Sequence, residues 1–281
     1  MVTASGDQTC RLWDTSTHLE IQTLRGHTGS VKAVRFAARP HRTPALATVS
    51  RTGGPITGLP PQVSTRPDNP HVFASASRDG RVMLWDTRGG SHPTCVLHNV
   101  HEATSDLGGA KRKRGWRGLP VLPQSVSSVA YLHDAAHTLA TSGASDGAVK
   151  LWDSRFVASR QGKRRSEPAP LHTLTPRRTG LGRRHGIVCL SVDASGKRML
   201  AGSADNTIYV YDTVRPSEGE VAQLRHGPRI DSFYIRAAFS PDGRFVISGS
   251  SDENVYLFDV RREPKGALAK GSPLTGACAC V

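Results

Sequence analysis

Five times along this chain an aspartate lies six residues before an aromatic residue, and each aromatic is followed by a second aspartate. Each first aspartate is in a turn of small residues, and alternating apolar residues lead from it to the aromatic. A fixed offset kept five times indicates an internal repeat, which decides the fold. The pairs are Asp7 with Trp13, Asp79 with Trp85, Asp146 with Trp152, Asp205 with Tyr211, and Asp252 with Phe258.

Residues 70–90 show how one copy of the repeat is expected to fold. Residues 71–76 alternate as a short, half-buried strand does, and residues 77–80 have the composition of a tight turn. Residues 81–85 return as the next strand, and the dipeptide Gly26-His27 precedes the unit. These features are typical of WD repeats. The sequence therefore predicts an all-β fold, a WD-repeat β-propeller of four-stranded blades.

The repeated residues are expected to be structural. In WD blades a histidine, a serine or threonine, the turn aspartate and the tryptophan form a buried hydrogen-bond network, because burial of an unpaired aspartate or histidine is costly. A catalytic role for the turn aspartates is the disfavoured alternative. The best match to the network is His27, Ser75, Asp79 and Trp85. The same structural role is expected for Asp146, Trp152, Asp205 and Asp252.

The spacing of the repeats indicates long insertions. Successive aromatic residues are 72, 67, 59 and 47 residues apart, whereas a plain WD unit needs roughly 40–45 residues. We assign insertions to about 39–69, 99–123 and 155–184, and interpret them as solvated loops or disorder. Residues 1–260 form the predicted propeller, and residues 261–281 are a tail expected to be irregular.

The two ends of the propeller are expected to leave the ring incomplete. Residues 2–5 correspond to the second strand of a blade, and the fifth aromatic comes 23 residues before the last residue. About five repeat units are visible, and closed propellers have about 4–8 blades. A fragment of a larger propeller is favoured over a ring closed by an unusual blade.

The basic charge is concentrated in the insertions. The formal net charge is +14, with 37 basic and 23 acidic residues. Three clusters (111–117, 155–165 and 177–184) carry the whole excess and contain no Asp or Glu. They could solubilise loops, or attract nucleic acid, an acidic protein or a nuclear import receptor. Their clearest import candidate is Lys111, Arg112, Lys113 and Arg114, which favours a nuclear location, with the cytoplasm as a second location.

Enzyme, metal and membrane signatures are missing from the sequence. There is no Gly-rich phosphate loop, His-Glu-x-x-His or G-x-S-x-G motif, so we expect no catalytic residue and no cofactor. The five cysteines lack paired ligand spacing, and Cys278 and Cys280 are too close together for a convincing zinc site. No apolar run approaches 20 residues, so a membrane span is not expected.

Several strings together resemble one family. They are TASGDQT (3–9), SRDGRVMLWDTR (77–88), ATSD (103–106), QSVSSV (124–129), ASDGAVKLWDSR (144–155) and DSFYIRAAFSPDGRFVISGSSDENVYLFD (231–259). The order and the sequences of these segments resemble those of the denticleless family, the substrate receptors of cullin-4 RING ubiquitin ligases. The resemblance covers about residues 1–260. The insertion at 39–69 is extra, and the first and last blades expected for the family are absent.

The resemblance implies how the chain would join the ligase. Receptors of this kind dock on the damage-binding adaptor of cullin-4 through WD-x-Arg motifs, which here contribute Asp86 and Arg88, and Asp153 and Arg155. An arginine just past a strand end can pair with a carboxylate or carbonyl of a partner. The alternative is an ion pair within the blade, for instance Arg88 with Asp86. Arg261 is a weaker third copy.

The resemblance also implies a substrate, a replication protein whose degron binds the DNA sliding clamp. Ubiquitin transfer itself would belong to the ligase's other subunits. The candidate degron-facing residues are Asp231, Ser232, Phe233, Tyr234 and Arg236. For Phe233 and Tyr234 the alternative is the buried start of a strand.

Two functional hypotheses therefore remain open at this point. The first is the ligase substrate receptor. The second is a WD scaffold whose basic insertions bind RNA or DNA directly, and a generic scaffold in an unrelated assembly is the residual possibility. The first is favoured.

Overall fold

The described part of the chain is built from β-strands and short connections. The computed structural model describes residues 1–36, 47–49, 71–101, 124–132, 137–155, 169–176, 185–225, 227–232, 234–260, 268–270 and 272–274. Between two strands lies a short 3-10 turn, η1 (Pro216–Glu218). No helix within these ranges is long and apolar enough to cross a membrane.

The strands form five sheets, numbered here as blades I to V and given in the order of their pairing. Blade I contains β3 (Glu20–Arg25), β2 (Thr9–Trp13), β1 (Val2–Ala4) and β5 (Ala47–Val49). Blade II contains β4 (Val31–Phe36), β6 (Val72–Ser77), β7 (Val82–Asp86) and β8 (Cys95–Leu97). Blade III contains β9 (Val126–Tyr131), β10 (Thr138–Gly143), β11 (Val149–Asp153) and β12 (His172–Leu174). Blade IV contains β13 (Ile187–Val192), β14 (Arg198–Ser203), β15 (Thr207–Asp212), β16 (Glu220–Arg225) and β20 (Leu268–Lys270). Blade V contains β17 (Ala237–Phe239), β18 (Phe245–Gly249), β19 (Val255–Asp259) and β21 (Ser272–Leu274).

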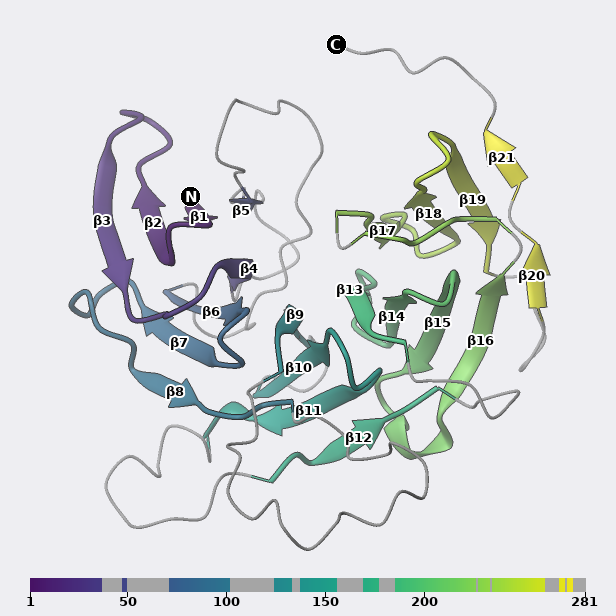
Figure 1. Ribbon diagram of the computed structural model, residues 1–281, viewed down its shortest axis with the longest axis horizontal. Helices are drawn as coiled ribbons and strands as arrows, with labels where there is room; N and C mark the ends of the chain where they lie inside the picture. The colour runs from purple at the N-terminus through teal and green to yellow at the C-terminus, as the bar shows by residue number, and fades with distance from the viewer. Residues whose placement is uncertain are drawn as a thin grey trace, which may run out of the picture.

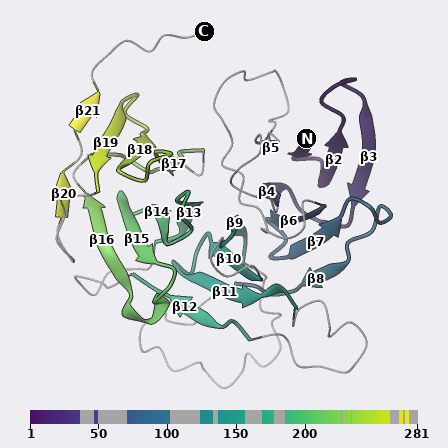
Figure 2. The ribbon, with the colours of Figure 1, turned by 180° about the vertical axis from the view of Figure 1, so that it is seen from behind.

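The blades are arranged around a common centre, as Figures 1 and 2 show from the two sides. The innermost strands of blades II to V are β4, β9, β13 and β17, and the ring of described strands is open between blade I and blade V (Figure 1). Within blades II, III and V every pairing is antiparallel. The predicted all-β WD-repeat propeller is thereby confirmed.

The repeated aromatic residues fill the cores between neighbouring blades. Trp85 is buried against Val2 and Leu12 of blade I and stacks on Phe73 of its own blade, with ring centroids 6.1 Å apart. Full burial of a large apolar side chain is worth about 1.5–3 kcal/mol. Later aromatics of the repeat lie in the next three cores: Trp152 between blades II and III, Tyr211 between III and IV, and Phe258 between IV and V.

The residue after each turn aspartate has a left-handed backbone. In blades II and III this residue is a glycine, Gly80 with φ 75° and Gly147 with φ 62°. In blades I, IV and V it is Gln8, Asn206 or Glu253, with φ between 64° and 73°. Side chains with a Cβ rarely adopt this conformation. Five turns with different residues thus share one backbone shape, which shows how strongly the repeat imposes it.

Short strands occur in ranges that composition marked as irregular. β5 lies in the predicted insertion 39–69, β12 lies in 155–184, and β20 and β21 lie in the tail predicted to be irregular. For these residues the prediction was wrong. Each strand is only three residues long, and pairing at a sheet edge supplies its hydrogen bonds, so no alternating pattern is required.

Blade I is completed in a different way from the others. β1 is its second strand from the inside, as predicted for residues 2–5, and β5 takes the innermost place. β5 runs parallel to β1, whereas the innermost strands β4, β9, β13 and β17 run antiparallel to their neighbours.

Candidate functional site

The network predicted for blade II is present and buried. His27 contacts Asp79 through Nδ1 (3.0 Å to Oδ2) and Ser75 through Nε2 (2.7 Å to Oγ). The indole Nε1 of Trp85 donates to the same Ser75 hydroxyl at 2.8 Å. His27, Ser75 and Trp85 are all buried. The network connects the segment before β4 to β6, to β7 and to the turn between them, and it brings together the four residues that were predicted to form it.

The carboxylate of Asp79 is held in its ionised form. Burial opposes ionisation, but hydrogen bonds from His27 and from the backbone N–H groups of Thr28 and Arg81 outweigh it, and they lower the pKa of Asp79 to about 2. An ionised aspartate accepts hydrogen bonds only. Asp79 therefore accepts hydrogen bonds from His27, Thr28 and Arg81, and it carries no proton that it could donate at neutral pH.

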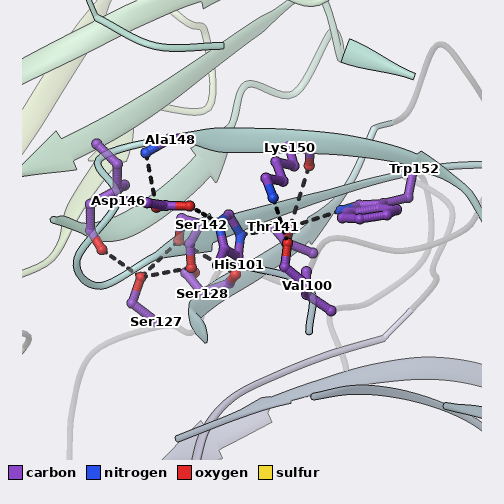
Figure 3. Close-up of polar contacts among 11 residues, drawn as sticks. Val100, His101, Ser127, Ser128, Thr141, Ser142, Asp146, Ala148, Lys150 and Trp152 are labelled. Carbon is purple, nitrogen blue, oxygen red and sulfur yellow. Dashed lines mark hydrogen bonds and ion pairs between the residues drawn. The ribbon is translucent and has the colours of Figure 1, made fainter. Parts of the chain in front are cut away.

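Blade III contains a second network of the same kind, shown in Figure 3. His101 contacts Asp146 through Nδ1 (2.7 Å to Oδ2) and Thr141 through Nε2 (3.0 Å to Oγ1). Nε1 of Trp152 donates to Thr141 at 2.9 Å. His101 and Thr141 were not predicted as members, and His101 had been placed inside the insertion 99–123. The sequence signal for this residue is a Gly-His dipeptide before the next repeat, and it is weak here because Val100 replaces the usual glycine.

In blades IV and V the turn aspartate has a local partner. The hydroxyl of Tyr209 donates to Asp205 at 2.6 Å, and the hydroxyl of Tyr256 donates to Asp252 at 2.7 Å. Each tyrosine lies four residues after its aspartate. The structure thus places Asp205 and Asp252 in hydrogen bonds within their own blades, with tyrosine partners that were not predicted.

Blade I keeps only part of this arrangement. Asp7 accepts hydrogen bonds from the backbone and hydroxyl of Thr9 and pairs with Arg11, four residues on, at 3.0 Å. Nε1 of Trp13 donates to Thr3 at 2.9 Å. The local partner at the fourth position is therefore a feature shared by blades I, IV and V.

Each of the two candidate docking arginines forms a bidentate ion pair with the aspartate two residues before it, and these two pairs are called forks below. Arg88 donates through Nε (3.0 Å) and Nη2 (2.7 Å) to the two carboxylate oxygens of Asp86. Arg155 does the same to Asp153 at 3.2 Å and 2.8 Å. The ion pair within the blade, which was the alternative considered, is present in both blades. The side chains of Arg88 and Arg155 nevertheless remain 58% and 60% exposed.

The forks fix both partners in their charged forms. The hydrogen bond from Arg88 lowers the pKa of Asp86, and the hydrogen bond from Arg155 lowers the pKa of Asp153. Reciprocally, each aspartate raises the pKa of its arginine. The backbone N–H of each arginine also donates to its aspartate, at 3.0 and 2.9 Å. Each guanidinium is thereby held in one orientation just past the end of β7 or β11.

Strand direction places the two candidate surfaces on opposite faces of the ring. β7 is antiparallel to β6, which is antiparallel to the innermost strand β4, so β4 and β7 run the same way. The same holds for β17 and β19 in blade V. Asp86 and Asp153 end their strands, whereas residues 231–236 precede β17. The candidate docking arginines and the 231–236 segment therefore lie at opposite ends of the strands.

The 231–236 segment is an exposed turn that leads into β17. Asp231 lies 3.7 Å from Arg229, and the side chains of both are more than half exposed. Ser232 accepts a hydrogen bond from the backbone N–H of Tyr234 at 3.3 Å. Tyr234 is 59% exposed, so the alternative of a buried strand start is wrong for this residue. In contrast, Nη1 of Arg236 is buried.

Some candidate residues lie outside the described ranges. They are Phe233, the import candidate Lys111, Arg112, Lys113 and Arg114, and the third arginine Arg261. The basic clusters at 111–117 and 177–184 lie there as well.

Two features of the described residues concern metal binding and cysteine chemistry. They contain no group of three or more His, Cys, Asp or Glu side chains that could hold a metal ion. Burial raises the pKa of Cys10 to about 12 and that of Cys95 to about 11, so both thiols are protonated at neutral pH.

A known protein family matches four segments of this chain. The family described as "WD domain, G-beta repeat" matches residues 60–86, 119–153, 171–212 and 226–259. These ranges cover the turn aspartate and the aromatic of blades II to V.

Relatives match over most of the chain. It is 30% identical over 253 residues to denticleless protein homolog B of Xenopus laevis, covering 87% of this chain and 31% of that protein. It is 32% identical over 255 residues to protein lethal(2)denticleless of Drosophila melanogaster, covering 86% and 28%. It is 30% identical over 254 residues to the human denticleless protein homolog, covering 86% and 30%. The chain spans less than a third of the length of these relatives.

Proposed function

Because the chain belongs to the denticleless-type WD-repeat proteins, we propose that it is the propeller of a non-catalytic substrate receptor for a cullin-4 RING ubiquitin ligase. In this role it binds the ligase on one side and a substrate on the other. The chemistry of ubiquitin transfer belongs to the other subunits of the ligase, which suits a chain of structural aspartates and protonated, buried cysteines.

The matching forks in neighbouring blades are the observation that carries this proposal. Arg88 and Arg155 occupy equivalent places at the ends of β7 and β11, with the same fork to the preceding aspartate. An exposed ion pair adds little to stability, so folding alone gives weak reason to keep two of them. A guanidinium held in one orientation loses less side-chain entropy when a partner binds it. We assign Asp86, Arg88, Asp153 and Arg155 to docking on the damage-binding adaptor of cullin-4.

The opposite face is assigned to the substrate. Asp231, Ser232, Tyr234 and Arg236 lie before β17, at the other end of the strands from the forks. An exposed tyrosine with a carboxylate and a hydroxyl beside it can contact both the apolar and the polar groups of a peptide. We propose that this face takes the degron of a replication protein bound to the sliding clamp. Such a role requires a nuclear location, and Lys111–Arg114 is the proposed import signal.

Capture of the purified cullin-4 adaptor tests the docking assignment. Arg88→Ala combined with Arg155→Ala should abolish capture of the adaptor by the immobilised chain, while soluble yield and thermal midpoint stay unchanged. A matched control is Arg215→Ala with Arg229→Ala, which also removes two exposed, paired arginines. The control should capture the adaptor as the wild type does. Undiminished capture by the Arg88/Arg155 variant would remove the docking assignment.

A second candidate function rests on the charge distribution. The whole excess of +14 lies in three basic clusters outside the blades, so the chain could bind RNA or DNA directly. That binding would survive the Arg88/Arg155 substitutions, weaken steeply with salt, and disappear when the basic residues in 111–117 and 177–184 are neutralised. Binding that is insensitive to salt, or absent, would exclude this candidate.

A further inference from the structure

A histidine lies beside each of the two forks. His71 immediately precedes β6, and its carbonyl accepts a hydrogen bond from the backbone N–H of Thr87 at 2.8 Å. His137 immediately precedes β10, and its carbonyl accepts the equivalent bond from Ser154 at 2.8 Å. Thr87 and Ser154 are the residues between the aspartate and the arginine of the two forks. These bonds place one histidine next to each fork, on the same face of the ring.

Blades IV and V have a different kind of residue at this backbone position. The carbonyl of Lys197, just before β14, accepts from the backbone N–H of Thr213 at 2.9 Å. The carbonyl of Arg244, just before β18, accepts from Val260 at 2.9 Å. Lysine and arginine keep their charge at neutral pH, whereas histidine ordinarily gains or loses its charge between about pH 5 and 8. Next to the forks, this position can therefore change its charge.

Each histidine is close enough to act on the aspartate of its fork. Val72, the residue after His71, pairs with Asp86 across the sheet, and the charged side chains at that end of β7 are those of Asp86 and Arg88. Nδ1 of His71 also lies 3.2 Å from Oγ1 of Thr87. The hydrogen bond from Arg88 is the main cause that lowers the pKa of Asp86, and the charge of His71 adds to it.

Blade III repeats this arrangement with its own residues. Thr138, the residue after His137, pairs with Asp153 across the sheet. The hydrogen bond from Arg155 is the main cause that lowers the pKa of Asp153, and the charge of His137 adds to it. The two blades thus share a constellation of histidine, aspartate and arginine at the same strand ends.

The groups that this constellation presents to a partner are cationic. The side chains of Asp86 and Asp153 are only 22% and 10% exposed, and each accepts both bonds of its fork. The forks use Nε and Nη2 of each arginine, so further N–H groups remain on each guanidinium. A protonated imidazole beside it adds a second charged donor. Such a pair of donors suits a carboxylate, which accepts charge-assisted hydrogen bonds through both oxygens.

We propose that His71 and His137 are further docking residues, which contact carboxylates on the cullin-4 adaptor and strengthen docking when they are protonated. The proposal rests on the proposed function, because it adds both histidines to the surface already assigned to the adaptor. Since protonation gives each imidazole a positive charge, docking is tighter at about pH 6 than at about pH 8. The complementary feature of the adaptor is an acidic side chain opposite each fork.

The affinity of the full chain for the purified adaptor, measured at about pH 6 and about pH 8 and at constant ionic strength, tests the proposal. The wild type should bind about three- to tenfold more tightly at the lower pH, as expected for two exposed charge pairs. His71→Gln combined with His137→Gln should lose this gain. The adaptor's own titration is common to all variants, so the difference between them reports the two histidines.

A charge-restoring variant separates the role of charge from the shape of the surface. His71→Lys combined with His137→Lys makes the charge permanent, and Lys197 shows that a lysine is accommodated at this position in blade IV. This variant should bind at about pH 8 as tightly as the wild type binds at about pH 6, and the thermal midpoints of the variants should agree.

Two exposed histidines away from the forks serve as the matched control. His98 follows β8, whose Leu97 pairs with Val82 at the start of β7, and His185 precedes β13. Both therefore lie at the opposite ends of the strands from the forks. His98→Gln combined with His185→Gln should keep the pH dependence of the wild type.

The possible outcomes separate this proposal from the proposed function. Equal pH dependence of the wild type and the Gln variant would overturn the role of the histidines while leaving Arg88 and Arg155 as docking residues. Binding by the Lys variant that is as weak at about pH 8 as that of the Gln variant would do the same. No capture of the adaptor by the wild type at either pH would overturn the proposed function, and this proposal with it.

Discussion

Blades II and III differ from blades IV and V in what holds the turn aspartate. In blades II and III the partner is a histidine 52 or 45 residues earlier in the chain, His27 for Asp79 and His101 for Asp146. In blades IV and V it is a tyrosine four residues later. The first arrangement joins distant segments, whereas the second stabilises only its own hairpin.

The same division appears in two other features. The left-handed residue of the turn is glycine in blades II and III, but Asn206 and Glu253 in blades IV and V. The bidentate arginine forks also occur in blades II and III, whereas Arg215 of blade IV approaches Asp212 only to 3.5 Å. The blades with the long-range networks are thus the blades that carry Arg88 and Arg155, the proposed docking residues. In both blades the long-range network connects the histidine segment to the strands at whose ends these arginines lie.

The largest expected difference between the two classes comes from removing the aspartate. Asp146→Ala leaves the fully buried His101 without its partner and should lower the free energy of unfolding by about 3 kcal/mol or more. Asp205→Ala should cost about 1 kcal/mol, because Asp205 is partly exposed and water can replace it. Urea denaturation followed by tryptophan fluorescence measures both. Equal losses would show that the histidine network gives blade III no special stability.

Acid stability tests the charged part of the blade II network. The pKa of Asp79 in the folded chain, about 2, is below the ordinary value of 3.8. Its contribution is therefore present above about pH 4 and is lost as the pH falls towards 2, a change of about 2 kcal/mol. Asp79→Asn should be less stable than the wild type at pH 7 and should lose less further stability between pH 4 and 2. Parallel curves for the two proteins would contradict the assigned charge.

The smallest expected effects separate two tyrosines of blade IV. Tyr209→Phe removes the hydrogen bond to Asp205 and should cost about 1 kcal/mol. Tyr211→Phe should be neutral or slightly stabilising, because the Tyr211 hydroxyl is buried without a hydrogen-bond partner among the described residues. Thermal unfolding of the two variants makes the comparison. A larger loss for Tyr211→Phe would show that its hydroxyl has a role in this blade.

The sequence predicted the parts of the fold that repeat. The spacing of aspartate and aromatic located β2, β7, β11, β15 and β19, because every blade needs a turn and an aromatic residue for its core. The network around His27 was also predictable, since Gly26-His27 and Ser75 match the usual pattern. His101 was missed because Val100 stands where the pattern has glycine, so that the histidine was assigned to the insertion 99–123. The partners Tyr209 and Tyr256 were missed although their equal distance from the aspartate was visible in the sequence.

The remaining features depend on three-dimensional closure of the ring. The outer strands β12, β20 and β21 have three residues each, too few for an alternating pattern. The sequence could suggest the arginines of the two WD-x-Arg motifs as docking residues, but it could not show that each is already held by its own aspartate.

The length of the strands fixes the distance between the two faces of the ring. A five-residue strand such as β7 or β11 rises about 17 Å from one face of the ring to the other. A partner held at the forks and a peptide held before β17 would therefore be kept apart by roughly that thickness, whatever the length of the loops between blades. Longer insertions in those loops would leave the distance between the two proposed binding surfaces unchanged, because the strands set that distance.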